Sequence, residues 1–363
     1  MAGPDPLQQM DRTYVRWKNR AFSYFGGCDY FRLASHPAVA AALRAGLRKY
    51  GLNVAASRLT TGNHAVYEEL EAALADFFGA PSAVLAPGGY AANAIAAQAL
   101  RGRFSRVFID EQAHSSLRDA SRQFHCRVQP FKHRDAGDLA RLLARARADD
   151  NPIVLTDGVF ARNGAVAPLE RYAEILPPRA LILVDDAHGA GILGAKGRGT
   201  PEFAGVSRRR LIQTITLSKA FGVFGGAILG GAALRKAIFQ SSPMFAGSTP
   251  LPPPLAAAAL RAVEMVRSDP RLRLRLEKNI RYAKSVLRGH GFAVQAAPTP
   301  ILTFVPSTPA QAGALQRRLI SRRVFPSFIR YPGGLEGGWF RFALSSEHRR
   351  AQLEDLLGAL TAD

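Results

Sequence analysis

Cysteine is scarce in this chain of 363 residues, which contains only Cys28 and Cys126. Two cysteines without a CxxC spacing exclude a disulfide framework and a zinc ribbon. The expected setting is therefore reducing and cytoplasmic.

Long apolar runs are also missing. No stretch reaches the roughly 18 apolar residues that a membrane helix needs, and residues 1–18 lack the apolar core of a signal peptide. We therefore expect no membrane span.

Acidic residues are outnumbered, with 28 Asp and Glu against 48 Lys and Arg, which gives a formal net charge of +20. Such a charge is typical of proteins that bind nucleic acid, anionic membranes, acidic partners or phosphorylated substrates. Here the arginines are spread through periodic segments, without a basic tail or an aromatic RNA-binding motif. The pattern therefore disfavours a nucleic-acid partner.

Strand and helix patterns alternate through the first two thirds of the chain. The predicted strands are 82–86, 106–109, 126–131, 153–156, 180–184 and 211–217, and the predicted helices between them are 90–100, 115–123, 136–148 and 169–176. Repeated βα units of this kind predict an α/β fold with a mostly parallel sheet covered by helices.

The regular alternation of strand and helix patterns ends after the proline cluster at residues 250–254. Helices are predicted at 256–267, 271–290 and 346–360, and short strands at 291–295, 301–305 and 339–343. We therefore divide the chain into an N-terminal arm (1–32), a large domain (33–257) and a small C-terminal α+β domain (258–363).

Lys219 follows the buried strand 211–217 and precedes a glycine-rich turn. A lysine that is hemmed in at a strand end loses its proton more easily and becomes a nucleophile able to form a Schiff base. The alternative from this stretch alone is a lysine that snorkels to the surface.

Three further groups sit at predicted strand ends, where open α/β sheets bind ligands. The turn at Gly88-Gly89-Tyr90 opens a helix and predicts an anion site, with Asn93 one turn further on, although glycines here also serve purely steric needs. The strand ending in Asp185-Asp186 leads to His188, which leaves a ligand site, a metal site, or a helix-capping or ion-pair role open.

His114 follows another strand, in the segment Asp110–Ser116. A lone loop histidine is usually structural. Together with Lys219, Asp185 and the glycine turn, however, it describes one ligand that has an aldehyde, a ring nitrogen, a flat face and a phosphate. Pyridoxal phosphate (PLP) has all four.

Ordered motifs from about residue 29 to the C-terminus resemble the α-oxoamine synthases, which are fold-type I PLP enzymes. The motifs are residues 29–30, 33, 36–37, 61–63, 89–93, 110 with 114–117, 157–160, 184–189, 197–199 and 216–222. The resemblance implies a homodimer with shared active sites. It also implies condensation of an amino acid with an acyl thioester, carried by coenzyme A or an acyl-carrier protein, with loss of carbon dioxide.

The resemblance also implies individual roles. Lys219 matches the Schiff-base lysine, Asp185 the partner of the pyridine nitrogen, His188 the residue near the ring hydroxyl, and His114 the residue that stacks on the ring. The other matched positions are Gly89, Tyr90 and Thr216 for the phosphate, Ser248 and Thr249 for the phosphate of the neighbouring subunit, and Arg341 with Cys28 and Asn93 on the substrate side.

Departures from the family pattern concern the substrate side. Cys28 stands where Asn is usual, Ala161 where Ser is common, Ser218 where Gly is common, Asp157 where Glu is common, and Arg32 where Gly is common. We therefore expect an unusual amino acid or acyl donor. The alternatives are another fold-type I reaction (aminotransferase, aldolase or decarboxylase-like) and a cofactor-binding scaffold without activity.

Overall fold

The computed structural model describes residues 5–145, 150–330 and 337–362. It divides into two compact units. Unit 1 comprises residues 1–36, 161–165 and 270–363, and unit 2 comprises residues 37–160 and 166–269. The division into an arm, a large domain and a small domain stays a prediction.

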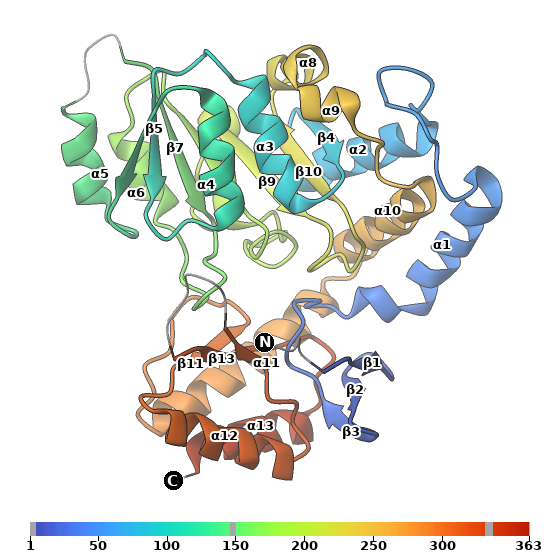
Figure 1. Cartoon of the computed structure of the whole chain (residues 1–363), viewed down its shortest axis with the longest axis vertical. Coiled ribbons are helices and arrows are strands. Elements are labelled where there is room, and N and C mark those ends of the chain that lie inside the picture. Colours follow the sequence, from blue (N-terminus) through green and yellow to red (C-terminus); the bar gives the residue numbers. More distant parts are fainter. Residues whose placement is uncertain (1–4, 146–149, 331–336, 363) are drawn as a thin grey trace. The chain divides into compact units, whose positions relative to one another are not determined.

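Seven strands among the described residues form the sheet of unit 2 (Figure 1). In spatial order they are β4 (Ser82–Ala86), β10 (Gly226–Gly230), β9 (Leu211–Thr216), β8 (Leu181–Asp185), β7 (Pro152–Asp157), β5 (Arg106–Asp110) and β6 (Arg127–Phe131). Only β10 runs antiparallel, between β4 and β9. Strands β7, β9 and β10 are buried at every position, as expected for a sheet covered on both faces.

Helices pack around this sheet. They are α1 (Pro37–Tyr50), α2 (Ala65–Phe78), α3 (Gly89–Ala99), α4 (Ser115–Ser121), α5 (Ala136–Leu143), α6 (Leu169–Ile175), α7 (Thr200–Phe203), α8 (Ala232–Ser241), α9 (Pro243–Gly247) and α10 (Pro253–Ser268), with short 3-10 turns at Arg122–Phe124 and Arg208–Arg210. Figure 1 shows α3 and α4 in front of the sheet. Fully buried alanines such as Ala92, Ala96 and Ala97 let α3 approach the strands closely.

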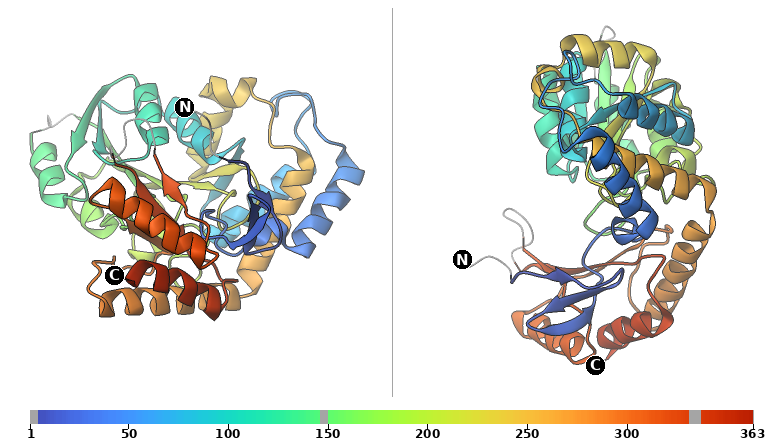
Figure 2. Two further views of the ribbon diagram at one scale, coloured as in Figure 1. Left: turned by 60° about the horizontal axis from the view of Figure 1, so that its bottom comes forward. Right: turned by 90° about the vertical axis from the view of Figure 1, so that its right-hand side faces the viewer.

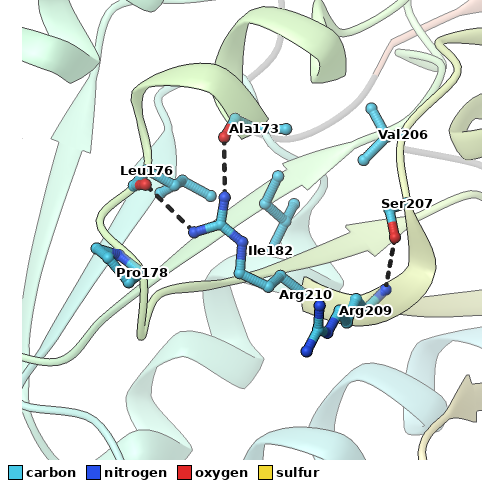
Figure 3. Close-up of a pocket in the computed structure, with 8 residues that line it drawn as sticks. All are labelled: Ala173, Leu176, Pro178, Ile182, Val206, Ser207, Arg209 and Arg210. Atoms are coloured by element: carbon cyan, nitrogen blue, oxygen red, sulfur yellow. Dashed lines mark hydrogen bonds between the residues drawn. The ribbon is translucent and has the colours of Figure 1, made fainter.

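A pocket of about 610 Å³ lies at the amino ends of β8 and β9 (Figure 3). Arg210 lines it and donates to the backbone carbonyls of Ala173 and Pro177 at 3.1 and 2.8 Å, at the end of α6. These bonds satisfy the last carbonyls of a helix, which is a structural role for the guanidinium. The pocket therefore occupies the end of the sheet opposite to Asp185 and Thr216.

Unit 1 combines the two ends of the chain. Its elements are β1 (Gln8–Gln9), β2 (Tyr14–Trp17), β3 (Arg20–Ser23), a 3-10 turn (Leu33–Ser35), α11 (Arg271–Gly289), β11 (Ile301–Phe304), α12 (Pro309–Ser321), β12 (Phe328–Ile329), β13 (Trp339–Ala343) and α13 (Arg350–Thr361). Both views of Figure 2 show the blue N-terminal strands beside the orange and red C-terminal elements. A parallel bridge between Ser23 and Val324 and a bond from the Ala343 amide to the Phe25 carbonyl at 2.7 Å join them.

The predicted α/β fold class is confirmed, but some elements differ. The strand expected at 291–295 is absent, because the amides of Gly291 and Phe292 bond back to the Arg288 and Leu287 carbonyls and cap α11 instead. Strands β1–β3 and β10 and helices α8, α9 and α12 were not predicted. Among the described residues, no helix is both long and apolar enough to cross a membrane.

Candidate active site

Polar side chains end several neighbouring strands of the unit 2 sheet. The last residues of β5, β7, β8 and β9 are Asp110, Asp157, Asp185 and Thr216. Because these strands are parallel, their carboxyl ends lie at one edge, and Asp157 is the register partner of Asp185. Lys219 follows three residues after β9, so the sheet brings the predicted lysine to the edge that carries the predicted aspartate.

The Lys219 amine lies 2.9 Å from His188 Nε2. His188 is only 5% exposed, in the turn that follows β8, and Lys219 is half-buried. The structure thus joins the predicted lysine and histidine in one hydrogen bond. An amine held in this way has a fixed position from which it can act as a nucleophile.

The Asp185 carboxylate is 7% exposed and accepts several hydrogen bonds. Asn93 Nδ2 donates to its Oδ2 at 2.6 Å, the Ala187 amide donates to its Oδ1 at 3.1 Å, and Ser116 Oγ lies 3.3 Å from Oδ2. These bonds fix the position of the Asp185 carboxylate at the edge of the sheet.

His114 caps the start of α4. Its Nδ1 accepts from the Ser116 amide at 3.2 Å and lies 2.8 Å from the Ser116 hydroxyl, while its own amide donates to Asp157 Oδ2 at 2.8 Å. Partial burial lowers the pKa of His114, although the nearby Asp185 carboxylate acts in the opposite direction. An accepting Nδ1 and a lowered pKa both favour a neutral ring with its proton on Nε2.

The turn between β4 and α3 lies against the end of β9. A β-carbon added to Gly89 would come within 2.8 Å of Thr216 Cβ, so only glycine allows this approach. The first amides of α3 therefore lie beside the Thr216 hydroxyl, which accepts from the Ser218 amide at 3.2 Å. Tyr90, the second residue of α3, is exposed, donates to Asp119 and packs edge-on against His114 with ring centroids 6.2 Å apart.

Asn93 is fully buried, and protein groups contact both ends of its amide, Asp185 and Ser116 at Nδ2 and Thr214 at Oδ1. Its contacts connect it to the Asp185 carboxylate. The substrate-side role expected for Asn93 stays a prediction.

The remaining predicted residues lie elsewhere in their units. Ser248 and Thr249 follow α9 and line a small cavity with Pro87, next to the Gly88–Gly89 turn. Cys28 and Arg341 belong to unit 1, where a guanidinium nitrogen of Arg341 donates to the Ala161 carbonyl at 3.4 Å. The roles of these four residues stay predictions.

Ser116 and Thr214 were not predicted as site residues, and Asp157 was named only as a substrate-side departure from the family pattern. Burial and the neighbouring Asp185 carboxylate raise the pKa of Asp157 well above its ordinary value. The sequence could have indicated Thr214, because residues two apart on a strand share a face and Thr216 is a predicted site residue. Asp157 likewise ends a predicted strand beside the one that ends in Asp185.

These residues suit PLP group by group. Lys219 offers a primary amine for an aldehyde, Asp185 a buried carboxylate for a ring nitrogen, and His114 a neutral imidazole for a ring face. The start of α3 at Gly89, with the Thr216 hydroxyl beside it, offers amides and positive dipole for a phosphate. The donor set therefore fits the cofactor that the sequence predicts.

Comparison with known proteins identifies the class. Residues 26–360 match the family model for aminotransferase class I and II. The chain is 38% identical to the 8-amino-7-oxononanoate synthase of Methylococcus capsulatus over 335 residues, which are 92% of this chain and 86% of that protein. It is 35% identical to the enzyme of the same name from Trichlorobacter lovleyi, over 98% of this chain and 92% of that protein.

Solved structures agree with this result. A serine palmitoyltransferase of Sphingomonas wittichii superposes with a TM-score of 0.90 at 27% identity, covering 98% of this chain and 90% of that one. The 8-amino-7-oxononanoate synthase of Francisella tularensis has a TM-score of 0.80 at 25% identity, covering 94% and 97%. The chain belongs to the aminotransferase class I and II family of fold-type I PLP enzymes. Within that family it belongs to the α-oxoamine synthases, which confirms the resemblance seen in the sequence.

Proposed function

We propose that this protein is a PLP-dependent acyltransferase that condenses an amino acid with an acyl thioester to an α-amino ketone. A bond forms between the amino acid's α-carbon and the acyl carbonyl carbon, the thiol leaves, and the amino acid's carboxylate is lost as carbon dioxide with uptake of one proton. The names of its relatives describe an amino-oxo acid product and a palmitoyl transfer to serine.

One observation carries the proposal. Lys219 Nζ lies 2.9 Å from His188 Nε2, and Asp185 ends β8, in the same unit and at the strand edge where ligands of such sheets bind. A nucleophilic amine beside a buried carboxylate is the minimum that PLP chemistry requires of a protein.

Each residue of the site has its own role in the proposed reaction. When bound, PLP supplies a ring that takes up the electron pair released at the amino acid's α-carbon. Asp185 would place its carboxylate for the ring nitrogen, and His114 would cover one face of the ring. Lys219 Nζ would hold the cofactor through its aldehyde and would move the proton at the substrate's α-carbon. His188 would orient the Lys219 amine.

On the substrate side, Arg341 is proposed to bind the amino acid's carboxylate, since a guanidinium forms two parallel bonds to such a group. Cys28 is proposed to lie beside the same substrate. Ser248 and Thr249 are proposed to reach the phosphate of a neighbouring subunit in a homodimer. The net charge of +20 suits the phosphates of coenzyme A or an acidic acyl-carrier protein, and the two free thiols suit a cytoplasmic location.

The test is thiol release by PLP-loaded protein supplied with a panel of amino acids and acyl thioesters. We expect free thiol only when both substrates are present, and a loss of at least roughly 1000-fold in Lys219→Ala. Lys236→Ala changes an exposed lysine on α8 and serves as the matched control. Thiol release at the parental rate by Lys219→Ala would refute the assignment.

The same panel tests the substrate hypothesis and the alternative reactions. Ordinary rates with glycine or alanine and common acyl-coenzyme A thioesters would contradict an unusual substrate. The matched family includes aminotransferases by name. Conversion of the amino acid to a keto acid without any thiol release would favour that second function.

A further inference from the structure

Thr214 is a buried threonine on β9, two residues before Thr216. Its side chain is 1% exposed, and its Oγ1 donates to Asn93 Oδ1 at 2.6 Å. The Val184 carbonyl lies further from the same oxygen, at 3.3 Å. A hydroxyl has one proton, so the shorter contact to Asn93 takes it.

The bond from Thr214 matches the orientation of the Asn93 amide that the Asp185 carboxylate requires. With Oδ1 facing the Thr214 hydroxyl, Nδ2 must face the Asp185 carboxylate, to which it donates at 2.6 Å. The reverse orientation would place an amide oxygen against a carboxylate, which has no proton to donate. The Thr214 hydroxyl, the Asn93 amide and the Asp185 carboxylate therefore form a hydrogen-bonded series in which every donor meets an acceptor.

We propose that Thr214 is a positioning residue that, through Asn93, holds the Asp185 carboxylate in place for the cofactor's ring nitrogen. An amide whose oxygen accepts a hydrogen bond is a stronger donor through its nitrogen. A stronger bond from the amide holds the carboxylate more firmly in its position. The inference rests on the proposed function, because it assigns Asp185 to PLP.

The positions of these three hydrogen-bonded side chains in the fold support this role. Thr214, Asn93 and Asp185 come from β9, α3 and β8, so the bonds connect two neighbouring strands to the helix that packs on them. Asn93 Nδ2 also lies 3.0 Å from Ser116 Oγ, and that hydroxyl lies 2.8 Å from His114 Nδ1. The amide that accepts from Thr214 therefore contacts both Asp185, the partner proposed for the ring nitrogen, and Ser116, which contacts His114.

The experiment measures the dissociation constant of PLP from the apoprotein by quenching of intrinsic fluorescence. Thr214→Val keeps the shape of the side chain and removes the hydroxyl. We expect it to raise the dissociation constant about three- to tenfold, as for the loss of one hydrogen bond. Thr214→Ser restores a hydroxyl and should return the constant to within about twofold of the parent.

Two controls separate positioning from a general loss of structure. Thr156→Val removes another fully buried strand hydroxyl, which donates to the Asp157 carbonyl at 3.0 Å, and should leave PLP affinity unchanged. Thermal unfolding of each apoprotein checks that the variants fold. If Thr214→Val unfolds, the comparison of Thr214→Ser with Thr214→Ala still isolates the hydroxyl.

A double-mutant cycle tests the route through Asn93. In an Asn93→Ala background, Thr214→Val should have no further effect on PLP affinity, because the intermediate group is gone. A folded Thr214→Val protein with parental affinity would overturn the inference, as would an equal effect in both backgrounds. A parental apoprotein that does not bind PLP would instead overturn the proposed function itself.

Discussion

Asp185 and Asp186 are adjacent at the end of β8, but their side chains lie in two different environments. Asp185 faces α3 and α4, where Asn93 and Ser116 contact its Oδ2. Asp186 accepts from the Thr200 hydroxyl at 2.5 Å, the Thr200 amide at 2.8 Å and Gln213 Nε2 at 2.7 Å. Neighbouring strand residues point to opposite faces, so one sequence motif supplies two separate functions.

Asp186 is fully buried, and its carboxylate oxygens bond to protein groups. A β-carbon at Gly199, whose φ is 93°, would collide with the Asp186 carboxylate. Burial raises the pKa of Asp186 to about 7, although the bonds from Thr200 and Gln213 oppose this shift. The comparison teaches that burial of a carboxylate at a strand end does not by itself mark a site. The hydrogen-bond partners distinguish the role proposed for Asp185, which is cofactor binding, from that of Asp186, which supports a loop.

The strongest test of this comparison is Asp185→Asn, which removes the charge and keeps the shape. We expect activity to fall on the order of 100- to 1000-fold, as for loss of a preorganised electrostatic group. The free energy of unfolding should change by less than about 2 kcal/mol. Steady-state thiol release and urea unfolding measure the two quantities. An active Asp185→Asn enzyme would break the comparison.

Asp186→Asn should affect stability and its dependence on pH. The folded-state pKa of about 7 lies above the ordinary value, so between those values the folded chain holds a proton that the unfolded chain has lost. The free energy of unfolding of the parent therefore falls as pH rises, by about 2 kcal/mol from pH 5 to pH 7 for this one group. The difference between parent and Asp186→Asn in urea unfolding should show this slope. A difference independent of pH would contradict a raised pKa.

Thr200→Val tests whether the hydrogen bonds to Asp186 stabilise the fold. It removes the hydroxyl that donates to Asp186 Oδ1 and leaves a buried acceptor without that partner. We expect a loss of about 1.5 kcal/mol in the free energy of unfolding. Activity per folded molecule should stay at the parental value, and Thr200→Ser should recover most of the stability. A selective loss of activity would show that this environment also serves catalysis.

Asp157→Asn should have the smallest effect. Burial and the Asp185 carboxylate raise the pKa of Asp157 and so favour its neutral form, which a carboxamide resembles in shape and charge. The side-chain oxygen of Asn can still accept from the His114 amide, as Asp157 does at 2.8 Å. We expect thiol release within about threefold of the parent. A loss comparable to that of Asp185→Asn would mean that the charge is shared between the two residues.

Much of the central fold could be predicted because local pattern and tertiary environment agree there. Strand 82–86 was predicted with the bounds that β4 has in the structure. Strand β10 was missed because Gly226–Gly230 begins and ends with glycine and follows a glycine-rich turn, which resembles a loop.

The contacts within the site could not be predicted in the same way. Asn93 reads as a residue one turn into a helix, and only the packing of α3 against β8 and β9 shows that Asp185 and Thr214 occupy both ends of its amide. The neutral tautomer of His114 depends likewise on the Ser116 amide, a backbone group without a signature in the sequence. Such distances follow from tertiary packing, and the residue pattern specifies only which groups can take part.

The pairing of β4 with β10 affects how the protein is made. In the sheet, β4 is hydrogen-bonded only to β10 among the described strands, although β4 ends at Ala86 and β10 begins at Gly226. During synthesis, the turn at Gly88–Gly89 therefore remains without its strand support until more than half of the chain has emerged. Non-local pairing of this kind slows folding and leaves a strand exposed in the meantime. Capture of the cofactor is thus a late event in the life of each new chain.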